Sequence, residues 1–197
     1  MLMLKKNNIA LQPAFLIYLA FSLLLLPFRW LLAWLLAVSL HELSHWLMLC
    51  AMKVKIYSVT FGANGAEIET EHMMNHRELL CALAGPLGSC ILVIFIRIYP
   101  ELAVCGILQS LYNFLPIYPL DGGRVLRCLS GMLLNDEWST AVVLSVEWVV
   151  FAILFVVAVY CTFILKLGVV PLVLLCALFL KNKSIKIPCK HAKQIVQ

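Results

Sequence analysis

Apolar runs long enough to cross a lipid bilayer recur along almost the whole chain of 197 residues. A hydrocarbon layer of about 30 Å is crossed by about 20 helical residues. Such runs lie at 9–28, 30–52, 79–98, 101–119, 140–165 and 167–180. They leave little material for a soluble domain, and a composition with 63% hydrophobic and 13% charged residues agrees. The sequence therefore predicts an all-α polytopic membrane protein with about six transmembrane helices.

The basic residues predict which side of the membrane each loop occupies. Six crossings put both termini on one side, and cytoplasmic loops of membrane proteins carry an excess of Lys and Arg. With cytoplasmic termini, twelve of the 15 Lys and Arg residues lie inside and Arg29, Arg97 and Lys166 lie outside. We therefore expect a multi-pass cell-membrane protein with both termini cytoplasmic and a first span that is retained rather than cleaved.

One loop differs from the apolar runs. Residues 54–61 are β-branched and aromatic, Gly62 to Gly65 has the composition of a turn, and 66–70 continues the pattern. This predicts a small cytoplasmic β-hairpin after the second span. We expect residues 1–180 to form a single membrane-embedded domain and 181–197 a short basic cytoplasmic tail.

Two compositional features exclude other kinds of site. The net charge of +5 comes from residues between and after the apolar runs, without the aromatic-interleaved patch typical of nucleic-acid binding. The eight cysteines are scattered without a C-x-x-C pair, so they predict neither a disulfide framework nor a thiolate zinc site.

The second apolar run contains the pattern H-E-x-x-H at residues 41–45. On a helix, His41 and His45 lie one turn apart on the same face and can bind one zinc ion, while Glu42 is placed to act as general base toward the attacking water. Ionisable groups near the middle of a bilayer are costly, so they should face the protein interior and share a ligand. A polar cluster that only holds helices together is the alternative, but it needs neither this spacing nor the intervening acid.

A catalytic zinc site usually has three protein ligands and an open position, so the histidines need a third partner. Asp121 is the best candidate, because the other aspartate, Asp136, lies in a polar loop. Asp121 follows the run L-Y-N-F-L-P-I-Y-P-L at 111–120, whose prolines interrupt helical hydrogen bonding. Interrupted backbone at membrane depth is tolerated where protein or a water-filled cavity receives it, as at an active site. An ordinary cytoplasmic turn is the alternative.

The two motifs together, H-E-x-x-H at 41–45 and N-x-x-P-x-x-P-L-D-G-G at 113–123, resemble the site-2 protease family of intramembrane zinc metalloproteases. The similarity covers a catalytic core of about 30–127, with A-G-P at 84–86. The small size of the chain is closest to the bacterial branch that includes stage IV sporulation protein FB, which implies a bacterial inner or plasma membrane.

The resemblance implies a set of residue roles. Zinc would be bound by His41, His45 and Asp121, with Glu42 as the catalytic base and Asn113 as a catalytic polar group near the substrate or oxyanion. The implied function is hydrolysis of a peptide bond in or near a transmembrane segment of a membrane-associated protein, as in regulated intramembrane proteolysis. Partners would be that substrate, the lipid bilayer and a membrane regulatory protein, and no nucleic acid.

The hairpin suggests how an unwound substrate is held. We expect the 54–61 strand to add the substrate at its edge, with Val59 and Phe61 as substrate-binding residues. Gly122 joins them, because a residue without a side chain permits close backbone approach. Ser89 stands where many family members have Asn, which predicts the loss of one polar contact. Glu147 in the fifth run predicts either a group lining a water or substrate path or a partly buried acid near the interface.

Three other functions remain open from the sequence. A catalytically silent scaffold of the same fold would not need Glu42. A metal or ion transporter also uses intramembrane His, Glu and Asp, but many transporters carry internal repeats, and none is evident here. A prenyl-protein processing metalloprotease takes its third ligand from a different acidic motif, which the D-G-G at 121–123 disfavours.

Overall fold

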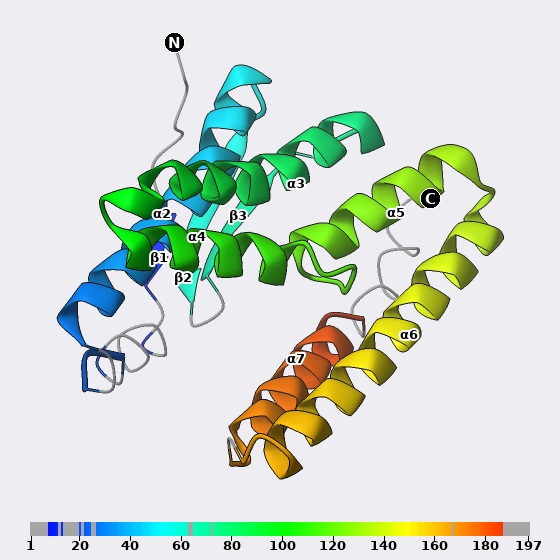
Figure 1. Ribbon diagram of the computed structural model, residues 1–197. Helices are drawn as coiled ribbons and strands as arrows, with labels where there is room; N and C mark the ends of the chain where they lie inside the picture. The colour runs from blue at the N-terminus through cyan, green and yellow to red at the C-terminus, as the bar shows by residue number, and fades with distance from the viewer. Residues whose placement is uncertain are drawn as a thin grey trace. The chain divides into compact units, whose positions relative to one another are not determined.

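The computed structural model describes residues 8–11, 13, 20, 22–24, 27–62, 65–71, 73–166 and 168–186. The chain is mostly helical and divides into two compact units, Met1–Phe114 and Leu115–Gln197 (Figure 1). The first unit contains β1 (Asn8–Leu11), α2 (Phe28–Ala51), β2 (Ile56–Gly62), β3 (Gly65–Thr70), α3 (Asn75–Cys90), the 3-10 helix η1 (Ile91–Arg97) and α4 (Pro100–Asn113). The second contains α5 (Asp121–Leu133), α6 (Asp136–Phe163) and α7 (Val170–Lys186).

The helices of the first unit pack closely through small side chains. α2, α3 and α4 contact one another, and Ala33 and Ala37 of α2 are fully buried. They form a cluster with Leu92, Leu102 and Cys105, whose members come from η1 and α4. In a bilayer, lipid tails are as apolar as leucine, so close van der Waals packing of small residues stabilises helix contacts. α3 also packs on α2, and its residues Cys81 and Ser89 contact the two histidines of the H-E-x-x-H motif.

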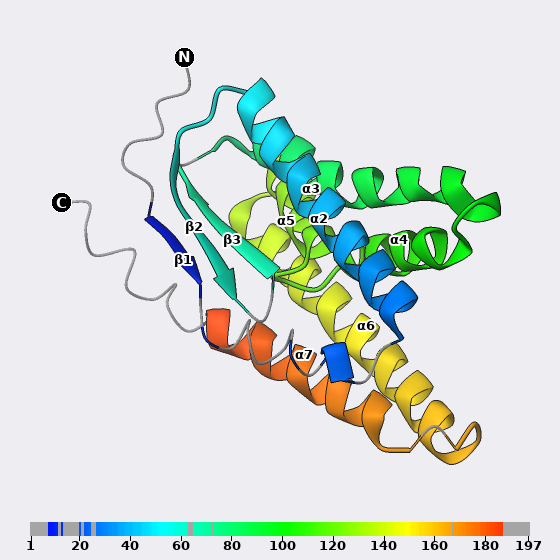
Figure 2. The same cartoon turned by 90° about the vertical axis from the view of Figure 1, so that its left-hand side faces the viewer.

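A three-stranded sheet completes the first unit, with the strand order β1-β2-β3 (Figure 2). β1 runs parallel to β2, and β2 runs antiparallel to β3 within the segment for which the sequence predicts a hairpin. The sheet is anchored by an apolar cluster in which Val54, Ile56 and Ile68 pack with Leu49 of α2 and Cys81 of α3. The hairpin is therefore fixed to the C-terminal end of α2.

The second unit is built on α6. The segment between Leu115 and Leu120 folds into turns whose side chains pack on this helix. Ile117 is fully buried and Leu120 is nearly so, in a cluster with Leu178 of α7. α5 contacts α6, and α6 contacts α7. The unit thus holds the start of α5 through the turns that precede it.

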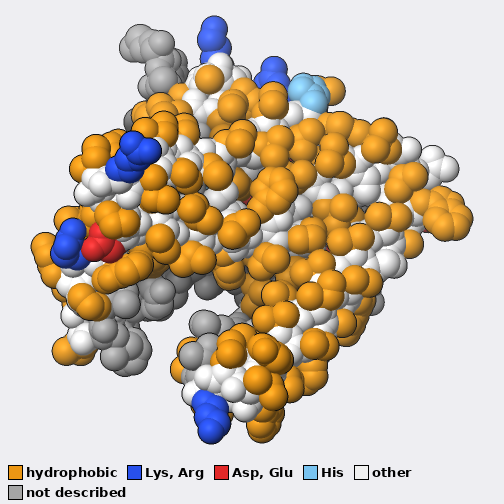
Figure 3. Space-filling view, in the orientation of Figure 1, with side chains coloured by type: hydrophobic (Ala, Val, Ile, Leu, Met, Phe, Trp, Pro, Cys, Tyr) orange, Lys and Arg blue, Asp and Glu red, His pale blue; other side chains and the backbone are white. Residues whose placement is uncertain are grey.

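Three helical segments of the described chain are long and apolar enough to cross a membrane: Phe28–Ala51, Asn75–Arg97 and Asp136–Phe163. Most of the face drawn in Figure 3 carries hydrophobic side chains, and some are largely exposed, such as Ile98 at 81%. Contiguous exposed apolar surface of this extent is unusual in a soluble protein. The prediction of a membrane protein is confirmed at this level.

The predicted spans differ from the structure in two places. Residues 8–11 form strand β1 and not the start of a helix, and most of the remaining 9–28 run lies outside the described residues. α4 ends at Asn113, six residues before the end of the 101–119 run, because the following segment contains Pro116 and Pro119. The count of six spans, the single-domain boundaries and the 181–197 tail stay predictions.

Candidate metal centre

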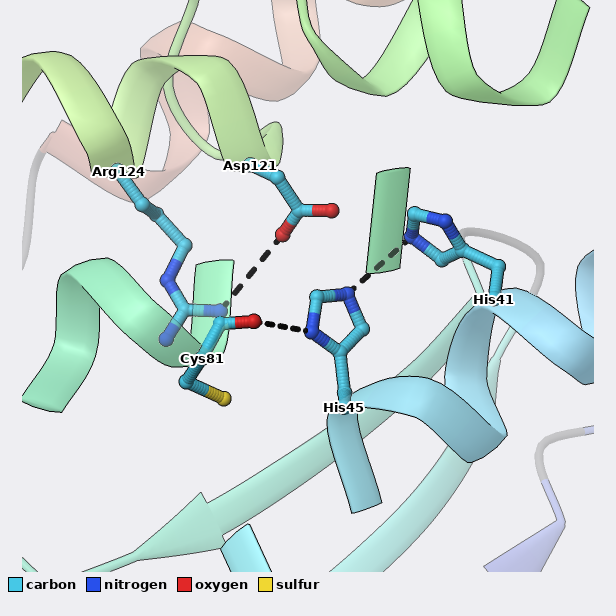
Figure 4. A network of polar contacts seen from close by, with 5 residues as sticks. All are labelled: His41, His45, Cys81, Asp121 and Arg124. Atoms are coloured by element: carbon cyan, nitrogen blue, oxygen red, sulfur yellow. Dashed lines mark hydrogen bonds and ion pairs between the residues drawn. The ribbon is translucent and has the colours of Figure 1, made fainter. Parts of the chain in front are cut away.

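The two histidines of the H-E-x-x-H motif lie on one buried face of α2. His41 is 3% exposed and His45 is 8% exposed, whereas Leu43 between them is exposed. Their Nε2 atoms are 3.2 Å apart, and the rings meet edge to face (Figure 4). The i, i+4 spacing brings the rings together because residues four apart are neighbours on a helix surface.

The other ring nitrogen of each histidine is held by α3. His45 Nδ1 lies 2.8 Å from the carbonyl oxygen of Cys81, and a carbonyl can only accept, so Nδ1 carries the proton. His41 Nδ1 lies 3.1 Å from Ser89 Oγ, whose own hydrogen is donated to the Gly85 carbonyl oxygen at 3.2 Å. His41 Nδ1 is therefore assigned as a donor to Ser89. In their neutral forms, both imidazoles then have a lone pair on Nε2.

Two nitrogen lone pairs at this distance in a buried site repel each other unless a cation lies between them. Neutral imidazole nitrogens are common zinc ligands, and metal-bound histidines usually donate the second ring N–H to a carbonyl, carboxylate or water. Two nitrogens bound tetrahedrally at 2.0–2.1 Å from zinc would be roughly 3.3 Å apart. The 3.2 Å observed between the Nε2 atoms of His41 and His45 fits that value. The donor set suits zinc.

Gly85, in the A-G-P segment of α3, leaves room for the two histidine rings because it has no side chain. A Cβ atom at this position would lie 2.6 Å from His45 Cε1 and 2.7 Å from His41 Cε1. Real Cβ atoms essentially never make contacts under 3.0 Å. Only glycine lets α3 come close enough for Cys81 and Ser89 to hold the two rings.

The two predicted catalytic residues also belong to the first unit. Glu42 is half-buried on α2, next to His41 in sequence. Asn113 is the last residue of α4, half-buried, and its Nδ2 donates a hydrogen bond of 3.0 Å to the carbonyl oxygen of Gln109. Their catalytic roles stay predictions.

Asp121 belongs to the second unit, where it is the first residue of α5. It is 6% exposed, and Gly122 and Gly123 after it are buried. Its Oδ1 atom is 3.8 Å from Arg124 Nη1, and the helix N-terminus also favours a negative charge at this point. Like the two histidines, it is a buried side chain that offers a metal-ligand atom. Its role as third ligand, and the role of Gly122 at the substrate, stay predictions.

The structure corrects the proposed part played by the hairpin. Val59 and Phe61 lie on β2, which is the central strand of the sheet. β1 pairs with one edge of these residues and β3 with the other. The prediction that the 54–61 strand adds a substrate at its own edge is therefore wrong, because a strand has only two edges for backbone hydrogen bonds. Substrate contact through Val59 and Phe61 stays a prediction.

Sequence reasoning also undervalued Ser89. Ser89 is fully buried and contacts His41, so serine at this position supplies a polar contact to the site, and the loss of a further contact relative to Asn stays a prediction. One signal was available. Gly85 and Ser89 are four residues apart, so on a helix they share a face and can meet the same partner.

Comparisons with known proteins agree with this site. No family model matches the chain. A putative zinc metalloprotease of Synechocystis sp. is 29% identical over 117 residues, which is 51% of this chain and 31% of that protein. A zinc metalloprotease of Methanocaldococcus jannaschii is 31% identical over 107 residues, 47% of this chain and 32% of that protein. The matches thus span about a third of the length of these relatives.

Among solved structures, the chain is similar to the site-2 protease from Methanocaldococcus jannaschii. The TM-score is 0.63 with 20% sequence identity, and the match covers 89% of each chain. The fold is therefore that of a site-2 protease. The predicted resemblance to site-2 proteases is confirmed, and zinc is the metal in the names of both sequence relatives.

Proposed function

We propose that this chain is an intramembrane zinc metalloprotease that hydrolyses a peptide bond in or near a transmembrane segment of a membrane-associated protein. The observation that carries the proposal is the buried pair of imidazoles whose Nε2 atoms lie 3.2 Å apart, while α3 holds the Nδ1 atom of each ring. Glu42 follows the first of them in sequence, as a general base of a zinc protease does. A polar contact made only to hold helices together needs neither two imidazoles on one helix face nor an acid next to the first of them.

Asp121 is the third ligand in this proposal. A catalytic zinc site with two histidines and one carboxylate keeps a fourth position open for water or substrate. Asp121 is a buried carboxylate at the first position of α5. The prolines of the second motif precede it in the sequence, and the two glycines of that motif follow it. The carboxylate of Asp121 would then neutralise half of the charge of the divalent cation, and the two neutral imidazoles would add none.

The chain's own residues divide the chemistry among them. A bound zinc ion polarises the substrate carbonyl and lowers the pKa of the attacking water. Glu42 takes a proton from that water as its oxygen forms a bond to the carbonyl carbon. Glu42 then delivers the proton to the amide nitrogen as the C–N bond breaks. Asn113 is placed in this scheme to donate a hydrogen bond to the oxygen that gains negative charge.

The surroundings of the site follow the same proposal. The enzyme is a multi-pass protein of the cell membrane with both termini cytoplasmic, and its substrate is a membrane protein or a membrane-associated protein. Three apolar helices of sufficient length support the membrane setting. The reaction would release part of the substrate from the membrane, as in regulated intramembrane proteolysis, with a membrane protein as regulator.

The decisive experiment compares wild type with Glu42→Gln. Membranes of cells that express each form are searched for a protein that is cut only by the wild type, and zinc is measured in each purified protein. We expect Glu42→Gln to keep its zinc and to lose cleavage. Glu137→Gln, at an exposed acid of α6, is the control and should cleave normally. Continued turnover by Glu42→Gln would contradict the proposal, and so would a wild type that binds no zinc.

A further inference from the structure

A buried acid in α6 has no part in the chemistry proposed above. Glu147 is only 2% exposed, although it lies within a helix of 28 residues that is long and apolar enough to cross a membrane. Burying an ionisable group in such a segment is costly, and such groups are retained where they have a specific partner. The group that Glu147 binds therefore indicates the role of its carboxylate.

Glu147 Oε1 accepts a hydrogen bond of 3.1 Å from the backbone N–H of Tyr118. Tyr118 lies between Pro116 and Pro119, in the turns that lead into α5. The prolines have no N–H to donate, so this segment can form few backbone hydrogen bonds of its own. Those it forms include Ile117 N–H to the Leu115 carbonyl oxygen. The carboxylate of Glu147 is thus an acceptor supplied to these turns by another helix.

Other contacts join the turns at 115–120 firmly to the start of α5. The guanidinium of Arg127 on α5 lies 4.0 Å from the centroid of the Tyr118 ring. A Cβ atom on Gly123 would lie 2.6 Å from the Ile117 carbonyl oxygen, so α5 begins directly against the turns. Arg124 N–H donates to the Leu120 carbonyl oxygen at 3.1 Å. A movement of Tyr118 would therefore move the first turn of α5.

Asp121 is that first residue of α5. We propose that Glu147 is a positioning residue: by binding the Tyr118 N–H, it holds the turns on α6 and so sets where the carboxylate of Asp121 lies. This role rests on the proposed function, in which Asp121 is a zinc ligand.

Three variants of Glu147 separate the effect of side-chain length from the effect of the negative charge. Glu147→Gln keeps an oxygen at the same distance along the side chain and removes the charge. Glu147→Asp keeps the charge and is shorter by one methylene, so its oxygen no longer reaches Tyr118. Glu147→Leu removes both. Ser145→Ala, at an exposed hydroxyl bonded within α6, is the matched control on the same helix.

The first measurement is hydrogen exchange of the Tyr118 amide in zinc-free protein in lipid nanodiscs. Losing the acceptor should speed exchange about tenfold in Glu147→Asp and Glu147→Leu, and Glu147→Gln should stay near wild type. The second is zinc affinity measured by competition with a chelating dye. Loss of an outer group that orients a metal ligand typically weakens affinity 10–100-fold, and we expect this for the Asp and Leu variants.

The outcomes distinguish the two proposals. If Glu147→Asp exchanges and binds zinc like wild type while Glu147→Gln is impaired, the charge matters and the anchoring role is wrong. If all three variants match the Ser145→Ala control, Glu147 has no positioning role. The two conservative variants keep this test decisive if Glu147→Leu does not fold. If the wild type itself binds no zinc, the proposed function fails, while Tyr118 exchange still tests the anchor.

Discussion

Gly85→Ala tests the candidate metal centre most directly, because one added methyl group meets both histidines. The new Cβ atom would lie 2.7 Å from His41 Cε1, whereas ordinary van der Waals contact begins near 3.4 Å. Unless α3 itself moves, both rings must therefore move, and the ring of His41 by about 0.7 Å. Metal–ligand distances hold only within about 0.2 Å of their ideal values. A ring displacement of this size would remove a histidine from the coordination sphere.

A movement of α3 away from the histidines would also disturb the site. Shifting α3 away by 0.7 Å would lengthen the hydrogen bonds that hold the rings, which are now 2.8 Å at His45 and 3.1 Å at His41. Both would approach or exceed the limit of a useful hydrogen bond. We therefore expect Gly85→Ala to weaken zinc binding by at least 10–100-fold, the usual loss when histidine orientation is disturbed. Cleavage should fall with it.

The assay measures zinc affinity by chelator competition in purified wild type, Gly85→Ala and Gly88→Ala. Gly88 is the matched control, because its added Cβ atom would meet the side chain of Ser44 on α2 and neither histidine. Both variants overpack the same pair of helices, at a typical cost of about 1–3 kcal/mol in stability. Only Gly85→Ala should lose zinc. Equal zinc affinities in the two variants would refute the assignment of this face as the metal centre.

Four further outcomes follow from the same geometry. Ser89→Ala removes the acceptor for His41 Nδ1 and should weaken zinc binding roughly 10–100-fold, measured against Ser110→Ala, whose hydroxyl bonds the Pro86 carbonyl oxygen instead. Asp121→Asn should lower zinc affinity and abolish cleavage, and an unchanged zinc content would remove it from the ligand set. A strong chelator should stop cleavage and added zinc should restore it, whereas activity in chelator would exclude a zinc enzyme. Gly106→Ala should lower stability by about 1–3 kcal/mol in chemical unfolding, because its Cβ would lie 2.6 Å from the Ser89 carbonyl oxygen.

The sequence was sufficient for the features that depend on local spacing. Histidines four residues apart must share a helix face, so the imidazole pair could be predicted without knowledge of what packs against it. The β-branched and aromatic residues of 54–61 were likewise enough to predict a strand. The three long apolar helices follow from length and composition alone.

What the sequence could not supply depends on contacts between distant segments. The parallel pairing of residues 8–11 with β2 joins segments about fifty residues apart. No local sequence pattern predicts this pairing. That pairing is why β2 is central and has no edge left for a substrate. The contact of Ser89 with His41 likewise depends on how closely α3 approaches α2, which Gly85 permits.

The position of the sheet constrains where a substrate could be cut. The hairpin is anchored near Leu49 and Val54, at the C-terminal end of α2. His45 lies six residues before that end, which is about 9 Å along a helix. An extended peptide covers this distance with about three residues. A substrate held as a strand beside the sheet therefore needs only a short unwound segment to reach the histidines. We expect the peptide bond that is cut to lie near a membrane surface, and not at the centre of the substrate's transmembrane helix. Placing helix-breaking residues at successive depths in a substrate would test this, since cleavage should respond most to those within the first turn or two of the membrane.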